Sequence, residues 1–205
     1  MEVTVPEATN EKPDPRIART RSLLWSTLVA LIEEQGYAAV SVRDITTRAN
    51  VNRSTFYRHY EDKDDLFRQG CSDLYDSIFR KMQSLVEETG EPEKMWTPDY
   101  FIQLFTLIDA ERRTLQVLGG PRSNPDFGRI TLDNIDVFVV EKRLKPFSTG
   151  SAKPDLDDLY AAAVSSIITG LATRWLGNPQ RFTLEEVCNV YRSVVSNGIK
   201  PYSRG

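Results

Sequence analysis

The sequence has few of the residues that bind metals or form disulfide bonds. Its 205 residues include only two cysteines, Cys71 and Cys188, and one histidine, His59. A structural zinc site or a Cys–His catalytic pair needs a richer supply of ligands, and two cysteines do not make a disulfide framework. We therefore expect no metal, no cofactor and a protein of a reducing compartment.

The chain also lacks long apolar runs and an excess of positive charge. No stretch approaches the ~20 apolar residues that a membrane helix needs, and the first fifteen residues lack the order of a secretory signal. We expect a cytoplasmic protein that contacts no membrane. Lys and Arg number 26 against 29 Asp and Glu, a net charge of −3, so any nucleic-acid site must be local. The net-basic stretch is 16–68, where we look first for a phosphate-binding surface.

Apolar residues recur at helical spacing along most of the chain, and no alternating strand pattern is found. In the N-terminal part we expect a first helix over 16–35 and a second over 41–49, where Ser41 and Asp44 form a capping box. A turn at Asn50–Asn52 then leads to a third helix over 53–60, and a fourth runs from Lys63 to about 90. Further along we expect helices over 98–118, from Asn124-Pro125 to Pro146, over 155–176 and from Thr183. The predicted fold is all-α.

Two short helices across a three-residue turn are typical of a helix-turn-helix. In the second helix, Phe56 and Tyr60 share one face, which leaves the opposite face to Arg53, Ser54, Tyr57 and Arg58. An Arg at a helix start can reach a guanine edge and a Ser hydroxyl can meet several bases, while Tyr57, Arg58 and His59 can bind phosphates. Backbone N–H groups at the helix start by Ser41, and beside Lys63, offer further phosphate contacts. The alternative is an exposed helix that carries two arginines and binds no DNA.

Residues 41–67, SVRDITTRANVNRSTFYRHYEDKDDLF, resemble the helix-turn-helix of TetR-type transcriptional regulators. With the preceding helix and Gly36-Tyr37 the resemblance covers a quarter of the chain. It implies that Arg53 and Ser54, with Thr55, face bases, that Tyr57, His59 and Lys63 face phosphates, and that Tyr60 belongs mainly to the core. The candidate DNA-binding residues are Ser41, Arg43, Arg53, Ser54, Thr55, Tyr57, Arg58, His59 and Lys63.

The resemblance also implies a helical C-terminal domain that dimerises and binds a small-molecule effector. The expected organisation is a disordered tail at 1–15, a DNA-binding domain at 16–62 and an effector-binding and dimerisation domain at 63–205. Apolar, aromatic walls are typical of small-molecule cavities. The candidate ligand-binding residues are Tyr75, Phe79, Trp96, Phe101 and Phe105, although ordinary core packing explains the same stripe.

The helix expected over 155–176 carries two stripes, one bulky and one small. The bulky stripe is Val164, Ile168, Leu171 and Trp175, and the small one is Ala162, Ser166, Thr169 and Thr173. A helix of this kind can bury one stripe in its own domain and let a partner helix approach along the other. Together with the last helix it resembles the two-helix dimerisation surface of the family. A wholly intramolecular core is the alternative.

These features predict a DNA-binding transcriptional regulator, in the first place a repressor, that binds a pseudo-palindromic double-stranded operator as a homodimer. The helix from Lys63 would link the DNA-binding domain to the effector domain. The alternative is a helical interaction module controlled by a protein partner. An enzyme is disfavoured, because the acidic cluster at Asp155, Asp157 and Asp158 suits the first turn of a helix without any catalytic role.

Overall fold

The computed structural model describes residues 15–89, 98–141, 154–178 and 180–197, and the secondary structure of these residues is entirely helical. This confirms the predicted all-α fold. Of the predicted tail at 1–15, residues 1–14 lie outside the described residues, as do Trp96 and Pro146, whereas Pro15 already begins the first helix. The elements are α1 (Pro15–Gln35), the short 3-10 helix η1 (Tyr37–Ala39), α2 (Val42–Arg48), α3 (Arg53–Tyr57), α4 (Lys63–Thr89), α5 (Pro98–Ala110), α6 (Arg112–Leu118), α7 (Phe127–Glu141), α8 (Pro154–Leu176) and α9 (Leu184–Asn197).

Two predicted helix starts have their capping residues in place. The Ser41 hydroxyl accepts a hydrogen bond from the Asp44 backbone N–H, and the Asp44 carboxylate accepts from the Ser41 backbone N–H. Thr183 and Glu186 repeat the same exchange at α9. Each exchange satisfies two N–H groups that a helix N-terminus would otherwise leave unpaired.

The single helix predicted over 98–118 is wrong, because the chain bends at Glu111 into α5 and α6. Glu111 has φ −101° and ψ 14°, and its N–H bonds to the Ile108 carbonyl three residues back. The bend turns α6 toward α1 and α8 while α5 stays against α9. Both Leu115 and Leu118 are buried as a result.

The helix predicted over 53–60 is also shorter than expected. It ends at Tyr57, after which the Arg58 N–H is shared between the carbonyls of Ser54 and Thr55 and the His59 N–H bonds to Phe56. This tightening into a 3-10 turn is common at a helix end. It leaves Tyr60 only 3% exposed.

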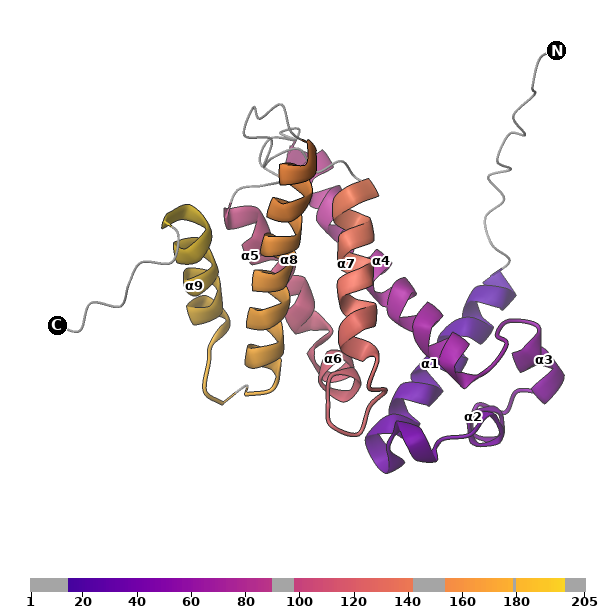
Figure 1. Cartoon of the computed structure of the whole chain (residues 1–205). Helices are drawn as coiled ribbons and strands as arrows, with labels where there is room; N and C mark the ends of the chain where they lie inside the picture. The colour runs from indigo at the N-terminus through magenta and orange to yellow at the C-terminus, as the bar shows by residue number, and fades with distance from the viewer. Residues whose placement is uncertain (1–14, 90–97, 142–153, 179, 198–205) are drawn as a thin grey trace, which may run out of the picture.

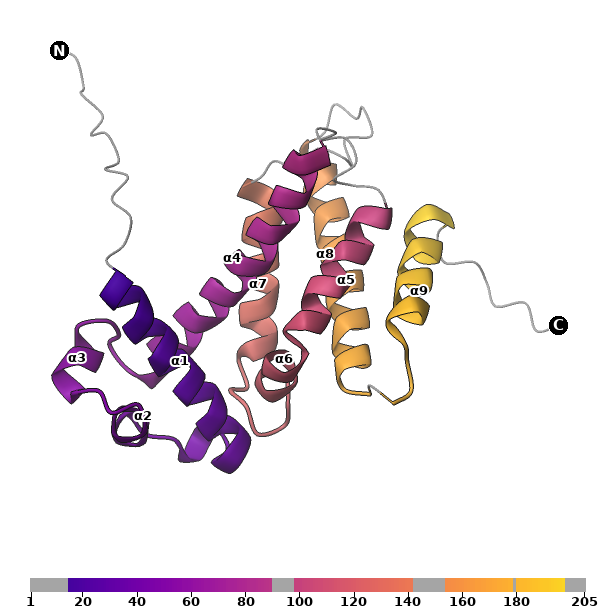
Figure 2. The same cartoon turned by 180° about the vertical axis from the view of Figure 1, so that it is seen from behind.

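The helices form two groups joined by α4 (Figure 1). At one end, α1, α2 and α3 pack together, and α4 starts there and continues into the larger group. In that group α7 lies between α4 and α8, and α9 packs on α5 and α8. Seen from behind in Figure 2, α9 and α3 lie at opposite sides of the molecule. The short α6 packs near α1 and so brings the two groups into a second contact.

The α1–α4 crossing depends on a glycine. A Cβ atom at Gly70 of α4 would lie 2.0 Å from a ring carbon of Trp25 in α1. The Trp25 ring also meets Phe67 edge-on, with 6.3 Å between ring centroids. Absence of a side chain at Gly70 therefore lets the indole pack directly on the α4 backbone.

Candidate nucleic-acid interface

The turn between α2 and α3 is built by two asparagines. Asn50 adopts φ 51°, a left-handed conformation that Asn tolerates better than most residues. The Val51 N–H then bonds back to the Thr46 carbonyl. The Asn52 side chain accepts the Ser54 backbone N–H at 2.9 Å and so caps α3. These contacts set the angle between the two short helices.

The inner face of α3 is anchored by aromatic packing. Phe56 is fully buried, and its ring centroid lies 5.8 Å from that of Tyr60. Ile45 of α2 and Leu28 of α1 are also fully buried in this core. The predicted inward direction of Phe56 and Tyr60 is therefore confirmed, and α3 has a fixed orientation on its neighbours.

The outer face of α3 presents the residues that the sequence pointed to. Arg53 and Ser54 are exposed, and Tyr57 is 48% exposed. The Arg53 guanidinium donates to the Tyr57 hydroxyl at 3.2 Å and lies 5.6 Å from the centroid of the ring. This i, i+4 contact restricts the Arg53 side chain to one side of the helix.

Two further side-chain contacts order the same surface. The Ser54 hydroxyl donates to the Asn52 side chain at 2.8 Å, so its oxygen is left to accept. Arg58 donates to the Thr55 hydroxyl at 3.3 Å. The surface thus combines two guanidinium groups with hydroxyls, which is the chemistry that base edges and phosphates require.

His59 and Lys63 lie at the edge of this surface. Burial lowers the pKa of His59, and the neighbouring charges of Arg58 and Arg21 lower it further. The imidazole is therefore neutral at pH 7 and can donate one N–H. The Lys63 ammonium donates to the carbonyls of Tyr37 and Val40, both at 2.9 Å, which uses two of its three N–H groups.

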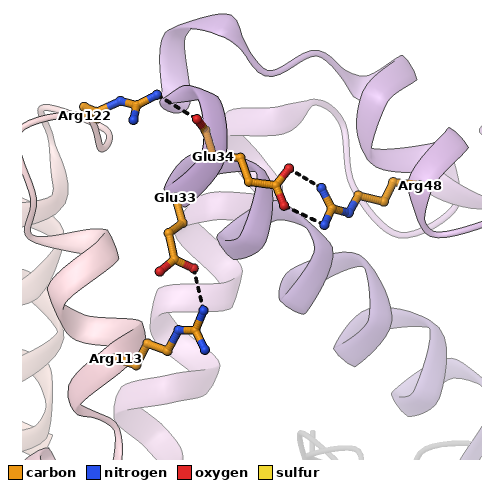
Figure 3. A network of polar contacts seen from close by, with 5 residues as sticks. All are labelled: Glu33, Glu34, Arg48, Arg113 and Arg122. Carbon is orange, nitrogen blue, oxygen red and sulfur yellow. Dashed lines mark hydrogen bonds and ion pairs between the residues drawn. The ribbon is translucent and has the colours of Figure 1, made fainter.

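At α2, the capping box occupies the Ser41 side chain. Its hydroxyl donates to the Asp44 carboxylate at 2.6 Å, and the hydrogen bonds from Ser41 hold the pKa of Asp44 below its usual value. Arg43, one residue inside the helix, is exposed. Arg48 at the other end forms two hydrogen bonds to the Glu34 carboxylate, which ties α2 to α1 (Figure 3).

Sequence reasoning missed the roles of Asn52 and Arg122. An Asn just before a predicted helix is a common N-cap, so the signal for Asn52 was present. Arg122, in the loop between α6 and α7, donates to the Glu34 carbonyl at 3.0 Å across 88 residues of sequence. No local pattern announces such a contact.

The predicted ligand-binding aromatic residues of the larger helical group do not form one cluster but make separate contacts. Tyr75 and Phe79 of α4 stack with centroids 6.3 Å apart, and the Tyr75 hydroxyl shares a hydrogen bond with Thr131 of α7. Phe105 of α5 is fully buried. It meets the rings of Trp175 and Tyr191 edge-on. The side chain of the fourth candidate, Phe101, lies outside the described residues, as does Trp96.

The two predicted stripes of α8 differ in exposure. In the bulky stripe Ile168 and Trp175 are buried, and Val164 and Leu171 are partly buried. In the small stripe Ala162, Ser166 and Thr173 are exposed and Thr169 is partly buried. The neighbouring α9 exposes Val190 at 48%. An accessible face of small side chains thus runs along α8, and α9, which packs against α8, has an exposed valine.

Among the described residues, no three His, Cys, Asp or Glu side chains gather closely enough to hold a metal ion. No helix within these ranges has the length and apolar character needed to cross a membrane.

The N-terminal helices match a known protein family. The family described as "Bacterial regulatory proteins, tetR family" matches residues 26–69. The HTH-type transcriptional repressor DhaR of Mycobacterium sp. (strain GP1) is 28% identical over 179 residues, which are 82% of this chain and 86% of DhaR. The uncharacterized HTH-type transcriptional regulator YxbF of Bacillus subtilis (strain 168) is 36% identical over 70 residues, 32% of this chain but only 18% of YxbF.

The fold is likewise similar to solved regulators. The transcriptional regulator FadR from Bacillus subtilis, crystallised with stearoyl-CoA, superposes with a TM-score of 0.61 at 20% sequence identity, covering 87% of this chain and 99% of that chain. The relatives carry the names of regulators and repressors rather than enzymes.

Proposed function

We propose that this chain is a DNA-binding transcriptional regulator of the TetR family, and that it acts as a homodimeric repressor whose operator affinity is lowered by a small molecule. The operator is a pseudo-palindromic DNA duplex. α3 of each subunit enters a major groove, where Arg53, Ser54 and Thr55 face bases. The phosphates are contacted by Tyr57, Arg58, His59 and the third N–H of Lys63. Arg43 of α2 and Ser41, the N-cap of α2, join them.

The observation that carries this proposal is the arrangement of α3. Its buried Phe56 and Tyr60 fix the helix on its neighbours, and the Asn52 cap fixes its start. The opposite face holds Arg53 and Tyr57, joined to each other and open to solvent. A rigid helix with a preordered Arg on its accessible face suits sequence recognition, since less side-chain freedom is lost on binding.

The dimer proposal rests on α8 and α9. The small stripe of α8 would allow close approach of a partner helix, and the exposed Val190 of α9 would be covered with it. Because α9 and α3 lie at opposite sides of each subunit, such a dimer leaves both α3 helices free for DNA (Figure 2). We propose 16–62 as the DNA-binding domain and 63–205 as the domain for effector binding and dimerisation.

The test is selection of duplexes from a random DNA library, followed by sedimentation of the selected complex. We expect an inverted repeat with half-sites about one helical turn, or a multiple of it, apart. Two chains should sediment with each duplex. Selection of a single half-site by a monomer would contradict the dimer, and no sequence enrichment at all would favour an interaction module controlled by a protein partner.

We propose that an effector binds within the larger helical group, with Tyr75, Phe79 and Phe105 as its candidate contacts. The predicted contacts of Trp96 and Phe101 fall on side chains outside the described residues. A ligand can lower operator affinity only if it binds the DNA-incompetent arrangement more tightly. Linkage then requires that the operator weakens ligand binding by the same factor, commonly about 5–150-fold. Calorimetric titration of compounds from a metabolite library, with and without the selected duplex, tests this. Equal affinities in the two titrations would show that the compound does not regulate DNA binding.

A further inference from the structure

The end of α1 is clamped from both sides by one residue of the larger helical group. The Arg122 guanidinium donates to the Glu34 carbonyl at 3.0 Å, just before the helix ends. The Arg122 backbone carbonyl accepts the Tyr37 N–H at 2.7 Å, just after it. Between these two contacts lies Gly36, which has φ 83°.

Gly36 makes this clamp possible through its backbone conformation. Its positive φ is a conformation that residues with a side chain rarely adopt. A Cβ atom there would lie 3.4 Å from both Nε and the carbonyl oxygen of Arg122, which is ordinary van der Waals contact. The chain reversal at Gly36 and the contact with Arg122 therefore occur at the same point.

The segment that Arg122 holds also anchors the start of α4. The buried Tyr37 donates from its hydroxyl to the Asp64 carboxylate and accepts at its carbonyl from Lys63. Its ring packs edge-on against Phe67, with centroids 5.1 Å apart. Lys63, Asp64 and Phe67 all belong to the first turns of α4. One short segment thus connects the end of α1, the start of α4 and the α6–α7 loop.

A second arginine of the larger helical group also contacts the end of α1, through an ion pair. Arg113 of α6 pairs with Glu33 at 3.0 Å, but its side chain is 84% exposed (Figure 3). Exposed ion pairs of this type contribute little and are screened by salt. Arg122 is exposed as well, but its guanidinium meets a backbone carbonyl in the last turn of a helix, where the helix dipole favours a cation.

We infer that Arg122 is a positioning residue that sets the orientation of the α1–α3 unit, and hence the spacing of the two α3 helices in the dimer. It is not among the residues proposed to contact DNA or the effector. The inference rests on the proposed function, because spacing has meaning only for a dimer that reads two half-sites. With the guanidinium contact removed, α1 pivots more freely on Gly36, and the dimer tolerates more than one half-site separation.

The test compares Arg122→Met with Arg113→Met. Each variant removes one positive charge from the same corner and keeps an apolar stem, so general electrostatic attraction to DNA changes equally in both. Binding is measured on duplexes that carry the selected half-sites at the selected spacing and at spacings one and two base pairs shorter and longer. Circular dichroism and sedimentation confirm that both variants are folded dimers.

We expect wild type and Arg113→Met to prefer the selected spacing by about 10-fold or more, as a mismatch in a recognised site typically costs. Arg122→Met should reduce that preference severalfold, with a small loss at the selected spacing. An unchanged preference in Arg122→Met, or an equal reduction in both variants, overturns the inference while leaving the proposed function intact. A wild-type protein that selects a single half-site overturns the proposed function, and this inference with it.

Discussion

The contact between Gly70 and Trp25 predicts that Gly70→Ala changes the free energy of unfolding in opposite directions with and without the Trp25 side chain. In an ordinary helix interior, Gly→Ala stabilises by about 1 kcal/mol, because alanine has the higher helix propensity. At Gly70 the added Cβ would lie 2.0, 2.3 and 2.6 Å from three ring carbons of Trp25. Overpacking of this kind costs about 1–3 kcal/mol.

The ring has little room to avoid the new methyl group, because it also packs against Phe67. We therefore expect Gly70→Ala to lower the free energy of unfolding by up to about 2 kcal/mol after the propensity gain is subtracted. In a Trp25→Ala background the clash is gone. There the same substitution should raise the free energy of unfolding by about 1 kcal/mol, which gives a coupling energy of about 1–3 kcal/mol.

The assay is urea unfolding of the four proteins of this cycle, followed by far-ultraviolet circular dichroism at one protein concentration, since unfolding of a dimer depends on concentration. Gly128→Ala in α7 is the matched control, because a Cβ atom there would meet nothing within 4 Å. It should be neutral or mildly stabilising. If Gly70→Ala stabilises both backgrounds equally, the α1–α4 crossing does not have the close contact described.

Three further outcomes follow from the residues around α3 and from the buried thiol. Asn52→Ala removes the α3 cap and should lower the free energy of unfolding by about 0.5–2 kcal/mol, whereas Asn52→Asp should retain most of it in the same urea assay. Burial and the charges of Arg58 and Arg21 lower the pKa of His59, whereas a bound phosphate would raise it again. DNA affinity should therefore rise as the pH falls and His59 gains its charge, and binding titrations of His59→Gln should lack this part of the pH dependence. A pH response that persists in His59→Gln would place its source elsewhere. Burial raises the pKa of Cys71 to about 12, so iodoacetamide should label this thiol only in urea, as peptide mass analysis would show; rapid labelling of the native chain would contradict its burial.

Local features explain which elements could be predicted from the sequence. The starts of α2 and α9 follow from Ser and Thr with an acidic residue three positions later, and these side chains cap the helices as predicted. The inward direction of Phe56 and Tyr60 follows from their i, i+4 spacing. Each of these signals lies within one helical turn, which is why a sequence pattern is sufficient.

The errors arose where tertiary packing determines the backbone. Nothing in the apolar pattern around Glu111 marks a break, because α5 and α6 bury their leucines against different neighbours. The contact of Arg122 with Glu34 joins residues 88 positions apart. Lys63 was predicted to face a phosphate, yet most of its hydrogen-bonding capacity serves the carbonyls of Tyr37 and Val40, and its DNA contact stays a prediction.

The central claim is that α3 reads base edges through Arg53, and one measurement tests it most directly. Wild type, Arg53→Ala and Tyr57→Phe are titrated against the selected operator and against every single base-pair substitution of one half-site. Arg53→Ala should cost about 1–3 kcal/mol and lose discrimination at one base pair, whereas Tyr57→Phe should weaken binding to all the duplexes about equally. If Arg53→Ala keeps the wild-type preference at every position, Arg53 contacts only the DNA backbone and the proposed mode of recognition is wrong.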